Sequence, residues 1–396
     1  MILLKAALLR TFMPLLLFAV LLTGCWSSRE LSDSAILSGA AIEKIGGEYK
    51  IIYQVMDPKK IKKNESKADV IITSEGPTVH EATLRLAKGL KRRLFLSHTR
   101  AIIISTELAR KEGILPLLDF GNRDQQFRLN SYIYVADHPA KILGLASPLD
   151  PISAFGLFKG TDSVKHDVSE MTAVSLREFM QMNQSPVGSG YVTLLKIHKE
   201  KPPAMIHVDI NGAAVFKDDK LVKVVRSPLL TRGILWFENK VKFGSMSLPI
   251  PGDPRSMAAI ELHSSSSKIK PKLREGKLTF DVNVEASGDI NEWQSGQPLT
   301  ERKIKQLELQ MKKQVIEEMN AALKEMRKDP ATDILNLGMQ VYRHYPKYWH
   351  QVHEDWDEIF KRTDVRIHVK SKITNLGMVK DRVADRPQTR LFPGID

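Results

Sequence analysis

Residues 70–105 read VIITSEGPTVHEATLRLAKGLKRRLFLSHTRAIIIS, and the class of fold follows from this stretch. The β-branched apolar run at 70–73 predicts a strand. Thr78 can cap the helix after it, with Glu81 as the capping-box partner, and the apolar residues of that helix keep a spacing of three or four. The apolar run at 101–105 predicts a short buried strand. A strand, a helix and a second strand in succession indicate a mixed α and β chain.

Strands and helices continue to alternate on both sides of this stretch. Upstream, two strands flank the turn Gly46-Gly47 and predict a hairpin, and the polar segment 57–67 is expected to be a loop. Downstream, the varied lengths of the connections predict strands of mixed direction. The expected strands are 35–42, 49–55, 130–135 and 191–198, and the expected helices lie within 106–120, at 139–145 and, as a pair, within 152–183.

The second half of the chain combines long strands with the longest helix. Pro202-Pro203 marks a linker, and a hairpin is expected after it. The segment 249–254 holds three prolines and is expected to be irregular. Thr300 caps a helix to about Lys328, whose apolar stripe predicts one face packed on a sheet, although its methionines also suit a partner surface. The other expected elements are helices at 228–236, 333–343 and 348–361, and strands at 206–216, 221–225, 258–270, 277–287, 365–369 and 373–376.

These elements predict an α+β (mixed α/β) fold with several domains, mixed sheets with packed helices, and a long helix in the C-terminal region. The apolar fraction of 42% and the charged fraction of 27% are typical of a globular chain. The expected divisions are a signal peptide at 1–24, a tether at 25–34, an N-terminal α/β domain at 35–200, a β-hairpin middle region at 201–255, a C-terminal α/β domain at 256–380 and a flexible tail at 381–396.

The N-terminus carries a targeting segment that ends at the single cysteine of the chain. Lys5 and Arg10 supply a positive region, the run 12–22 supplies the hydrophobic region, and Leu22-Thr23-Gly24-Cys25 has the form of a lipoprotein cleavage site. A lone cysteine forms no internal disulfide, so Cys25 is predicted to be the lipidation site, joined by a thioether to diacylglycerol. The alternatives are an uncleaved transmembrane helix, against which the two charges and Pro14 count, and an ordinary secretory signal.

The chain is basic, with 59 Lys and Arg against 46 Asp and Glu and a formal charge of +13. Its two basic clusters are Lys59-Lys60 with Lys62-Lys63, and Lys91-Arg92-Arg93; taken singly, each is typical of a solvated face. Neither is interleaved with aromatic residues as in a nucleic-acid platform, so no nucleic-acid partner is expected. The summed charge favours apposition to anionic lipid headgroups.

Most signatures of catalysis are missing from the sequence, which has no G-x-x-x-x-G-K-[ST] loop, no G-x-S-x-G elbow and no H-E-x-x-H helix. In the densest ionisable group, His350 and His353 could share a helix face and hold a metal. The favoured interpretation is an exposed acidic helix, so no enzyme activity, catalytic residue, metal or cofactor is expected. The group comprises His350, His353, Glu354, Asp355, Asp357 and Glu358, and the side chains expected to turn inward are Trp349, Val352, Trp356 and Ile359.

A series of segments resembles a known family, the C-subunit lipoproteins of spore nutrient-germinant receptors, Ger(x)C. The resemblance covers nearly the whole chain and depends on the order and number of the segments. The family often has Asp or Asn where this chain has Ser27. The segments are Gly24-Cys25-Trp26-Ser27-Ser28-Arg29-Glu30-Leu31, Asn211-Gly-Ala-Ala-Val-Phe-Lys-Asp-Asp-Lys-Leu-Val222, Thr231-Arg-Gly-Ile-Leu-Trp236, Asp333-Ile-Leu-Asn-Leu-Gly338, Tyr342-Arg343, Pro346, Trp349 and Trp356.

The resemblance implies a lipid-anchored, non-enzymatic receptor subunit that triggers spore germination from the outer face of the spore inner membrane. Its implied partners are a receptor A subunit, which is a membrane protein, and a transporter-like membrane B subunit. Two other functions stay open at this point. A solute-binding lipoprotein that captures a small germinant itself predicts a deep cleft between two lobes. A lipid-anchored hydrolase predicts a polar pocket, and the segment 350–358 is the only part of the sequence that supports this function.

Overall fold

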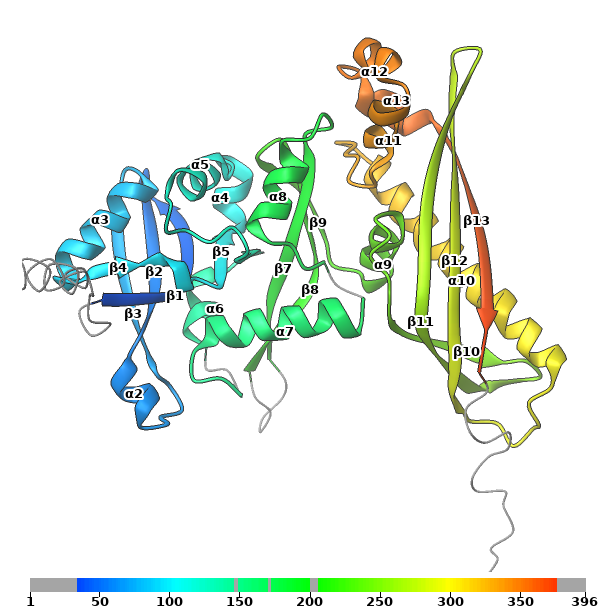
Figure 1. Ribbon diagram of the computed structural model, residues 1–396, viewed down its shortest axis with the longest axis horizontal. Helices are drawn as coiled ribbons and strands as arrows, with labels where there is room; N and C mark the ends of the chain where they lie inside the picture. The colour runs from blue at the N-terminus through cyan, green and yellow to red at the C-terminus, as the bar shows by residue number, and fades with distance from the viewer. Residues whose placement is uncertain (1–33, 146–148, 170–171, 200–205, 376–396) are drawn as a thin grey trace, which may run out of the picture.

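The structure, a computed structural model, describes residues 34–145, 149–169, 172–199 and 206–375. It is elongated, and its two β-sheets lie side by side along the long axis with helix α9 between them (Figure 1). Both sheets mix parallel and antiparallel pairs, and helices pack on both. The predicted fold class, α+β with mixed sheets and a long C-terminal-region helix, is confirmed.

The first sheet has nine strands in the order β3-β2-β1-β5-β6-β7-β8-β9, and β4 pairs with β1 outside this path. Its centre is parallel, from β1 through β5 and β6 to β7, whereas the strands at both ends pair antiparallel. The strands are β1 (Ser34–Ile45), β2 (Glu48–Met56), β3 (Asp69–Gly76), β4 (Arg93–Phe95), β5 (Ala101–Ser105), β6 (Tyr132–Ala136), β7 (Ser189–Lys199), β8 (Ile206–Lys217) and β9 (Lys220–Val225).

Helices cover both faces of the parallel centre of this sheet, which is why β5 and β6 are buried throughout. Ile102 and Ile104 of β5 join one buried cluster with α3, α4, α5 and α8, whereas Ile103 joins a second cluster with α6 and α7. The helices are α3 (Val79–Leu90), α4 (Thr106–Lys111), α5 (Leu115–Arg123), α6 (Pro139–Gly144), α7 (Ser153–Asp167) and α8 (Leu176–Asn183), with the short α2 (Pro58–Lys62) and a 3₁₀ turn at Leu96–His98 outside these layers.

The second sheet has the order β10-β11-β12-β13, and α10 lies along one of its faces (Figure 1). On β12 every second side chain is buried, among them Phe280, Val282 and Val284, and the intervening side chains are more exposed. This period of two gives the sheet one apolar face for α10. The elements are β10 (Gly244–Ile250), β11 (Asp253–Arg274), β12 (Lys277–Trp293), β13 (Asp364–Ile373), α9 (Pro228–Phe237), α10 (Glu301–Arg327), α11 (Leu337–His344), α12 (Pro346–Val352) and α13 (Trp356–Arg362).

Local capping explains where the main helices begin. Thr78 Oγ1 accepts a hydrogen bond from Glu81 N at 3.0 Å at the start of α3, which is the predicted cap, whereas the Glu81 side chain pairs with Arg85 at 2.8 Å and forms no capping box. Thr300 caps α10 in the same manner, through Lys303 N. Ser175 and Glu178 form a reciprocal capping box at α8. These side chains satisfy backbone donors that the first helical turn leaves unpaired.

Five expectations about individual elements differ from the structure. The segment 57–67 contains α2, because Asp57 Oδ1 caps Lys59 N and Lys60 N. The segment 249–254 is not irregular: β10 continues to Ile250, and β11 starts at Asp253 after a turn at Gly252, whose φ is +86°. The helix expected at 333–343 begins only at Leu337. The expected helix 348–361 divides into α12 and α13. The strand expected at 365–369 extends to Ile373 as β13, and residues 374–375, where a further strand is expected, are not in a strand.

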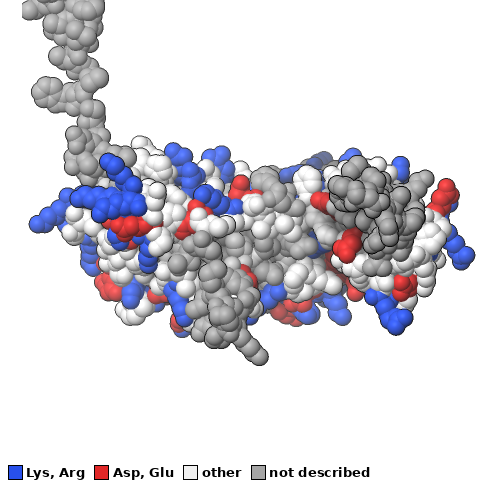
Figure 2. Space-filling model, turned by 90° about the horizontal axis from the view of Figure 1, so that it is seen from below, with Lys and Arg blue, Asp and Glu red and all other residues white. Residues whose placement is uncertain are grey.

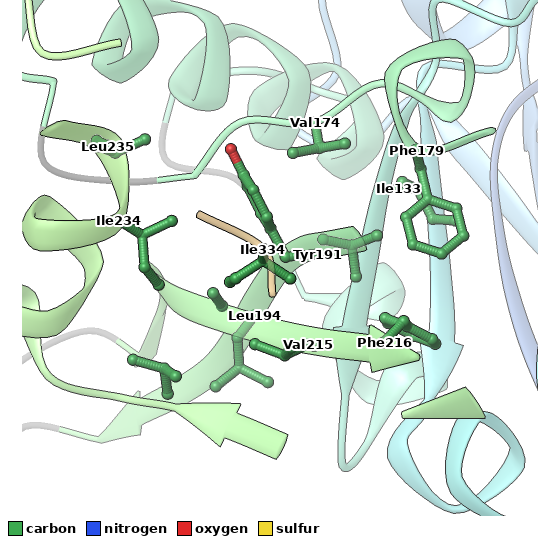
Figure 3. Close-up of a cluster of buried hydrophobic side chains, with 14 of the residues drawn as sticks. Ile133, Val174, Phe179, Tyr191, Leu194, Val215, Phe216, Ile234, Leu235 and Ile334 are labelled. Atoms are coloured by element: carbon green, nitrogen blue, oxygen red, sulfur yellow. The ribbon is translucent and has the colours of Figure 1, made fainter. Parts of the chain in front are cut away.

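The first sheet continues across residue 201, where the sequence predicts a domain boundary. β7 and β8 pair antiparallel from Ser189↔Lys217 to Lys199↔Ile206, and Pro202-Pro203 itself lies outside the described residues. Strand pairing thus places β8 and β9 with the N-terminal elements. The core also continues: Figure 3 shows side chains of β7, β8, α8 and α9 gathered with Ile334 of the C-terminal region.

Candidate functional site

The predicted lipidation site lies outside the described residues. Cys25, the leader and the segment Gly24–Leu31 precede Ser34, the first residue that the structure describes. Within the described part of the chain, no helix combines the length and the apolar character needed to cross a membrane. The lipidation of Cys25 therefore stays a prediction.

The ionisable cluster at 350–358 lies on the surface at the junction of α12 and α13. His350 and His353 stack with ring centroids 5.9 Å apart, and the other ionisable groups turn to different partners. Asp357 pairs with Lys217, and Glu358 with Lys361 at 2.6 Å. No group of three or more His, Cys, Asp or Glu among the described residues is placed to hold a metal ion. Trp349 and Trp356 are buried, as the helical spacing predicts.

Asp333 organises the segment Asp333–Gly338 as a buried carboxylate that accepts four hydrogen bonds. The donors are Leu335 N at 3.0 Å, Leu337 N at 3.3 Å, Gly338 N at 2.6 Å and Trp356 Nε1 at 3.0 Å. Burial raises the pKa of Asp333, and these four bonds oppose that rise because they stabilise the charged form. The carboxylate thus holds the start of α11 against α13, and it explains why residues 333–336 are not helical.

A buried ion pair joins α9 to α10. Arg232 Nε lies 3.5 Å from Glu318 Oε2, and only 6% of Arg232 and 4% of Glu318 is exposed. Trp236 Nε1 donates to the same oxygen at 2.7 Å, and Arg232 Nη1 donates to Ser245 O at 3.0 Å. A Cβ on Gly233 would overlap the carbonyl oxygen of Glu318. The two helices therefore approach more closely than any residue with a side chain at position 233 would permit.

An open hollow of ≈ 520 Å³ lies beside this contact, between the first turn of α9, the end of β10 and the middle of α10. Charged and amide groups converge there with a few apolar side chains, so the hollow suits a small polar molecule. A second hollow, of ≈ 630 Å³, lies near α3 and α5. Neither is a cleft between two α/β lobes. The first is lined by Pro228, Leu229, Arg232, Leu248, Pro249, Gln310, Lys313, Gln314, Glu317 and Glu318.

The hairpin of β8 and β9, which carries the segment Asn211–Val222, connects three parts of the molecule. Asp219 accepts from Ile114 N through its carbonyl at 3.0 Å and from Leu115 N through Oδ2 at 3.1 Å, which fixes the start of α5. Lys217 pairs with Asp357 of α13. Lys217 and Asp219, two residues of this segment, thus connect the hairpin to α13 and α5.

The connection from α9 to β10 ties the two sheets together. Tyr191 of β7 donates to Glu238 Oε2 at 3.0 Å and accepts from Lys240 Nζ at 2.8 Å. Burial raises the pKa of Tyr191. For Lys240, burial acts to lower the pKa, but Tyr191 and Glu238 outweigh it and raise the pKa, so the ammonium group stays charged. Ser169, after α7, accepts from Lys242 N and Phe243 N.

Sequence reasoning did not single out Glu318, Tyr191 or Lys240. Glu318 could have been found, because it is a carboxylate on the buried face of α10, between Val315 and Met319. An acid at such a position needs a partner. No comparable feature of the sequence identifies Tyr191 and Lys240, because their roles depend on the contact between them.

Two protein-family models match the chain, and both describe spore germination proteins. The spore germination protein N-terminal domain matches residues 27–197, and the spore germination B3/GerAC-like C-terminal domain matches residues 211–377. The chain belongs to this family, the Ger(x)C proteins, as its motifs predict.

Relatives from Bacillus subtilis (strain 168) match along nearly their whole length. Spore germination protein KC is 24% identical over 390 residues, which cover 92% of this chain and 95% of KC. Spore germination protein B3 is 25% identical over 372 residues, which cover 90% of this chain and 95% of B3. The crystal structure of the GerBC protein shares the fold, with a TM-score of 0.54 and 21% identity over 85% of this chain and 97% of that one. The family and these relatives support a role in spore germination.

Replacement of the buried carboxylate at 333 tests its structural role. Asp333→Ala leaves three backbone N–H groups and the Trp356 indole without their acceptor, and we expect a loss of about 3 kcal/mol or more in the free energy of unfolding. Urea unfolding followed by tryptophan fluorescence measures the change. The control is Asp329→Ala, an exposed carboxylate that pairs with Lys361; it should leave the unfolding midpoint nearly unchanged. Equal midpoints for the two variants would contradict the role of Asp333.

The contact between α9 and α10 is tested in the same assay. Glu318→Ala removes the carboxylate that balances the charge of Arg232 and accepts from Trp236, and we expect a loss of about 3 kcal/mol. Glu317→Ala removes the adjacent, exposed carboxylate from the same helix and should change the unfolding midpoint little. A Glu318→Ala variant as stable as Glu317→Ala would show that helix packing alone holds α9 and α10 together.

Proposed function

We propose that this protein is a lipid-anchored, non-enzymatic subunit of a membrane nutrient-germinant receptor that triggers spore germination. Its membership of the Ger(x)C family is the observation that carries the proposal. The leader that ends at Leu22-Thr23-Gly24-Cys25 supports lipid attachment at Cys25. Two acyl chains hold a soluble body on a membrane stably without a transmembrane helix.

The partners under this proposal are a membrane A subunit and a transporter-like membrane B subunit, with no nucleic acid involved. Relatives carry the names spore germination protein A3, B3 and KC, which is consistent with a multi-subunit receptor. The body then sits on the outer face of the spore inner membrane. Its closely tied elements suit it to hold other subunits in a fixed arrangement.

Capture of a small germinant by this chain is the second candidate function. The hollow beside Arg232 and Glu318 is the observation that favours it, because buried charges converge there on a space large enough for a small polar molecule. The hydrolase alternative has no comparable support among the described residues, since the groups at 350–358 turn to different partners.

Germination assays test the first proposal. In a host that lacks the sister receptors, deletion of this protein should abolish or strongly slow nutrient-triggered germination while sporulation continues. Complementation with Cys25→Ala should give unlipidated protein and restore germination poorly, whereas Ser27→Ala, two residues away, should restore it fully. Unchanged germination after the deletion would contradict the receptor role, and full membrane partition of the Cys25→Ala protein would contradict the need for the anchor.

Calorimetric titration tests the second candidate. If the hollow captures a germinant, the purified chain should bind an amino acid or sugar germinant saturably, and Gln314→Trp should abolish binding because the larger side chain fills the space. Lys312→Trp changes an exposed residue of the same helix that does not line the hollow, and it should bind normally. Equal binding by the two variants would show that the hollow is not the binding site.

A further inference from the structure

The two basic clusters of the chain, separated in sequence, lie toward the same end of the first sheet, because one precedes β4 and the other follows β2. β4 pairs with the first residues of β1, and Ser34 lies opposite Arg93, so the cluster Lys91-Arg92-Arg93 flanks the start of β1. β2 runs antiparallel to β1, with Leu37 opposite Val55. The end of β2, from which the segment 57–67 leaves, therefore lies at the same end of the sheet as Ser34.

The segment 57–67 is a closed projection that carries α2. Asp57 caps the helix, and Asp57 N donates to Ala68 O at 2.9 Å, which closes the base. Ala68 N in turn donates to Pro151 O at 2.9 Å, so the residues just before Pro151 are held beside the projection. In Figure 1, α2 extends beyond the sheet on its lower side.

Lysines dominate the exposed surface of this projection. Exposed side chains include Lys59, Lys62, Lys63 and Lys67, with Lys60 half-buried. Of the nearby acids, Asp57 caps α2, Asp150 pairs with Lys159 at 2.5 Å, and Asp69 is buried and accepts from Gln54. Glu65 is the exposed acid that remains in the segment. Figure 2 shows blue side chains gathered at the corresponding left end of the molecule.

Two apolar side chains are exposed on or beside this projection. Leu149 has 92% of its surface exposed, and Ile61 of α2 has 36%. An apolar side chain surrounded by lysines is typical of surfaces that contact the interface of an anionic bilayer: the charges approach the headgroups, and the apolar groups enter the boundary below them.

We propose that this surface, the basic end, lies against an anionic bilayer and inserts Leu149 and Ile61 into it. The basic end comprises Lys59, Lys60, Ile61, Lys62, Lys63, Lys67, Lys91, Arg92, Arg93 and Leu149.

The inference rests on the proposed lipid anchor only for its biological setting. Cys25 precedes Ser34 by nine residues, which span at most about 30 Å. An anchor at Cys25 would thus keep the basic end within reach of the membrane, and the charges would set which side of the body faces it. The anchor attaches the body, and the basic end orients it.

Vesicle binding by the unlipidated chain tests the proposal apart from the anchor. The chain from residue 26 onward keeps every member of both described core clusters, all of which follow Ser34. It should sediment with vesicles of phosphatidylcholine and phosphatidylglycerol, not with phosphatidylcholine alone, and should dissociate as salt is raised. Replacement of Lys59, Lys60, Lys62 and Lys63 by Gln should weaken binding by up to several hundredfold, since each lysine near such a surface contributes about fivefold and the four factors multiply.

A matched variant separates local docking from general charge. Lys305, Lys312, Lys313 and Lys324 are exposed on α10, and their replacement by Gln removes the same net charge from the other sheet. This variant should keep most of the vesicle affinity. Equal loss by the two variants, or no binding by the unchanged chain, would overturn the proposal.

The insertion of Leu149 has its own readout. A chain that starts at residue 26 contains no cysteine, so Leu149→Cys provides a single attachment point for a polarity-sensitive fluorophore. Its emission should shift to shorter wavelength on mixing with phosphatidylglycerol vesicles. The control is Leu309→Cys, because Leu309 on α10 is also apolar and 57% exposed. No shift at 149, or an equal shift at 309, would exclude insertion at the basic end and leave the germination and lipidation tests unaffected.

Discussion

The close approach of α9 to α10 is the constraint on which the rest of the structure depends. α9 follows the last strand of the first sheet, and α10 covers the second sheet, so their contact determines how the two sheets meet. Gly233 permits the approach, and Glu318 receives Arg232 and Trp236 at the point of contact. A buried ion pair adds less stability than its Coulomb energy suggests, but the loss of one partner is costly. The pair therefore fixes one arrangement of the helices.

Several other contacts repeat this pattern of a polar side chain that joins distant elements. Asp333 connects α11 to α13, Asp219 fixes α5, and Tyr191 holds the connection after α9 through Glu238 and Lys240. In the described residues these groups face one another and the backbone. A protein whose distant elements are held by such contacts presents a defined outer surface, which suits a subunit that positions other proteins. The charge is distributed unevenly over that surface, because the basic end lies near the start of β1, far along the long axis from α10.

The sequence by itself determined the elements whose causes are local. Thr78 and Thr300 cap their helices where the sequence places them, and the apolar runs of β5 and β6 are buried on both faces. The family was identified from the order of short segments, and such an order is recognisable even when the overall sequence identity is low. The form of the leader likewise predicts lipidation at Cys25 from adjacent residues alone. Each of these features depends on neighbours in the chain.

Only the tertiary structure decided the features that depend on strand register and helix packing. Nothing near Glu318 in the sequence names Arg232 as its partner, and nothing at 91–93 indicates that these residues lie beside Ser34. The helix expected from 333 starts at Leu337 because the Asp333 side chain takes the backbone donors that a helix would use. The strand at 249–250 persists despite Pro249 because β11 pairs with it. Such contacts join residues far apart in the chain, and their energies exceed the local preferences that a sequence displays.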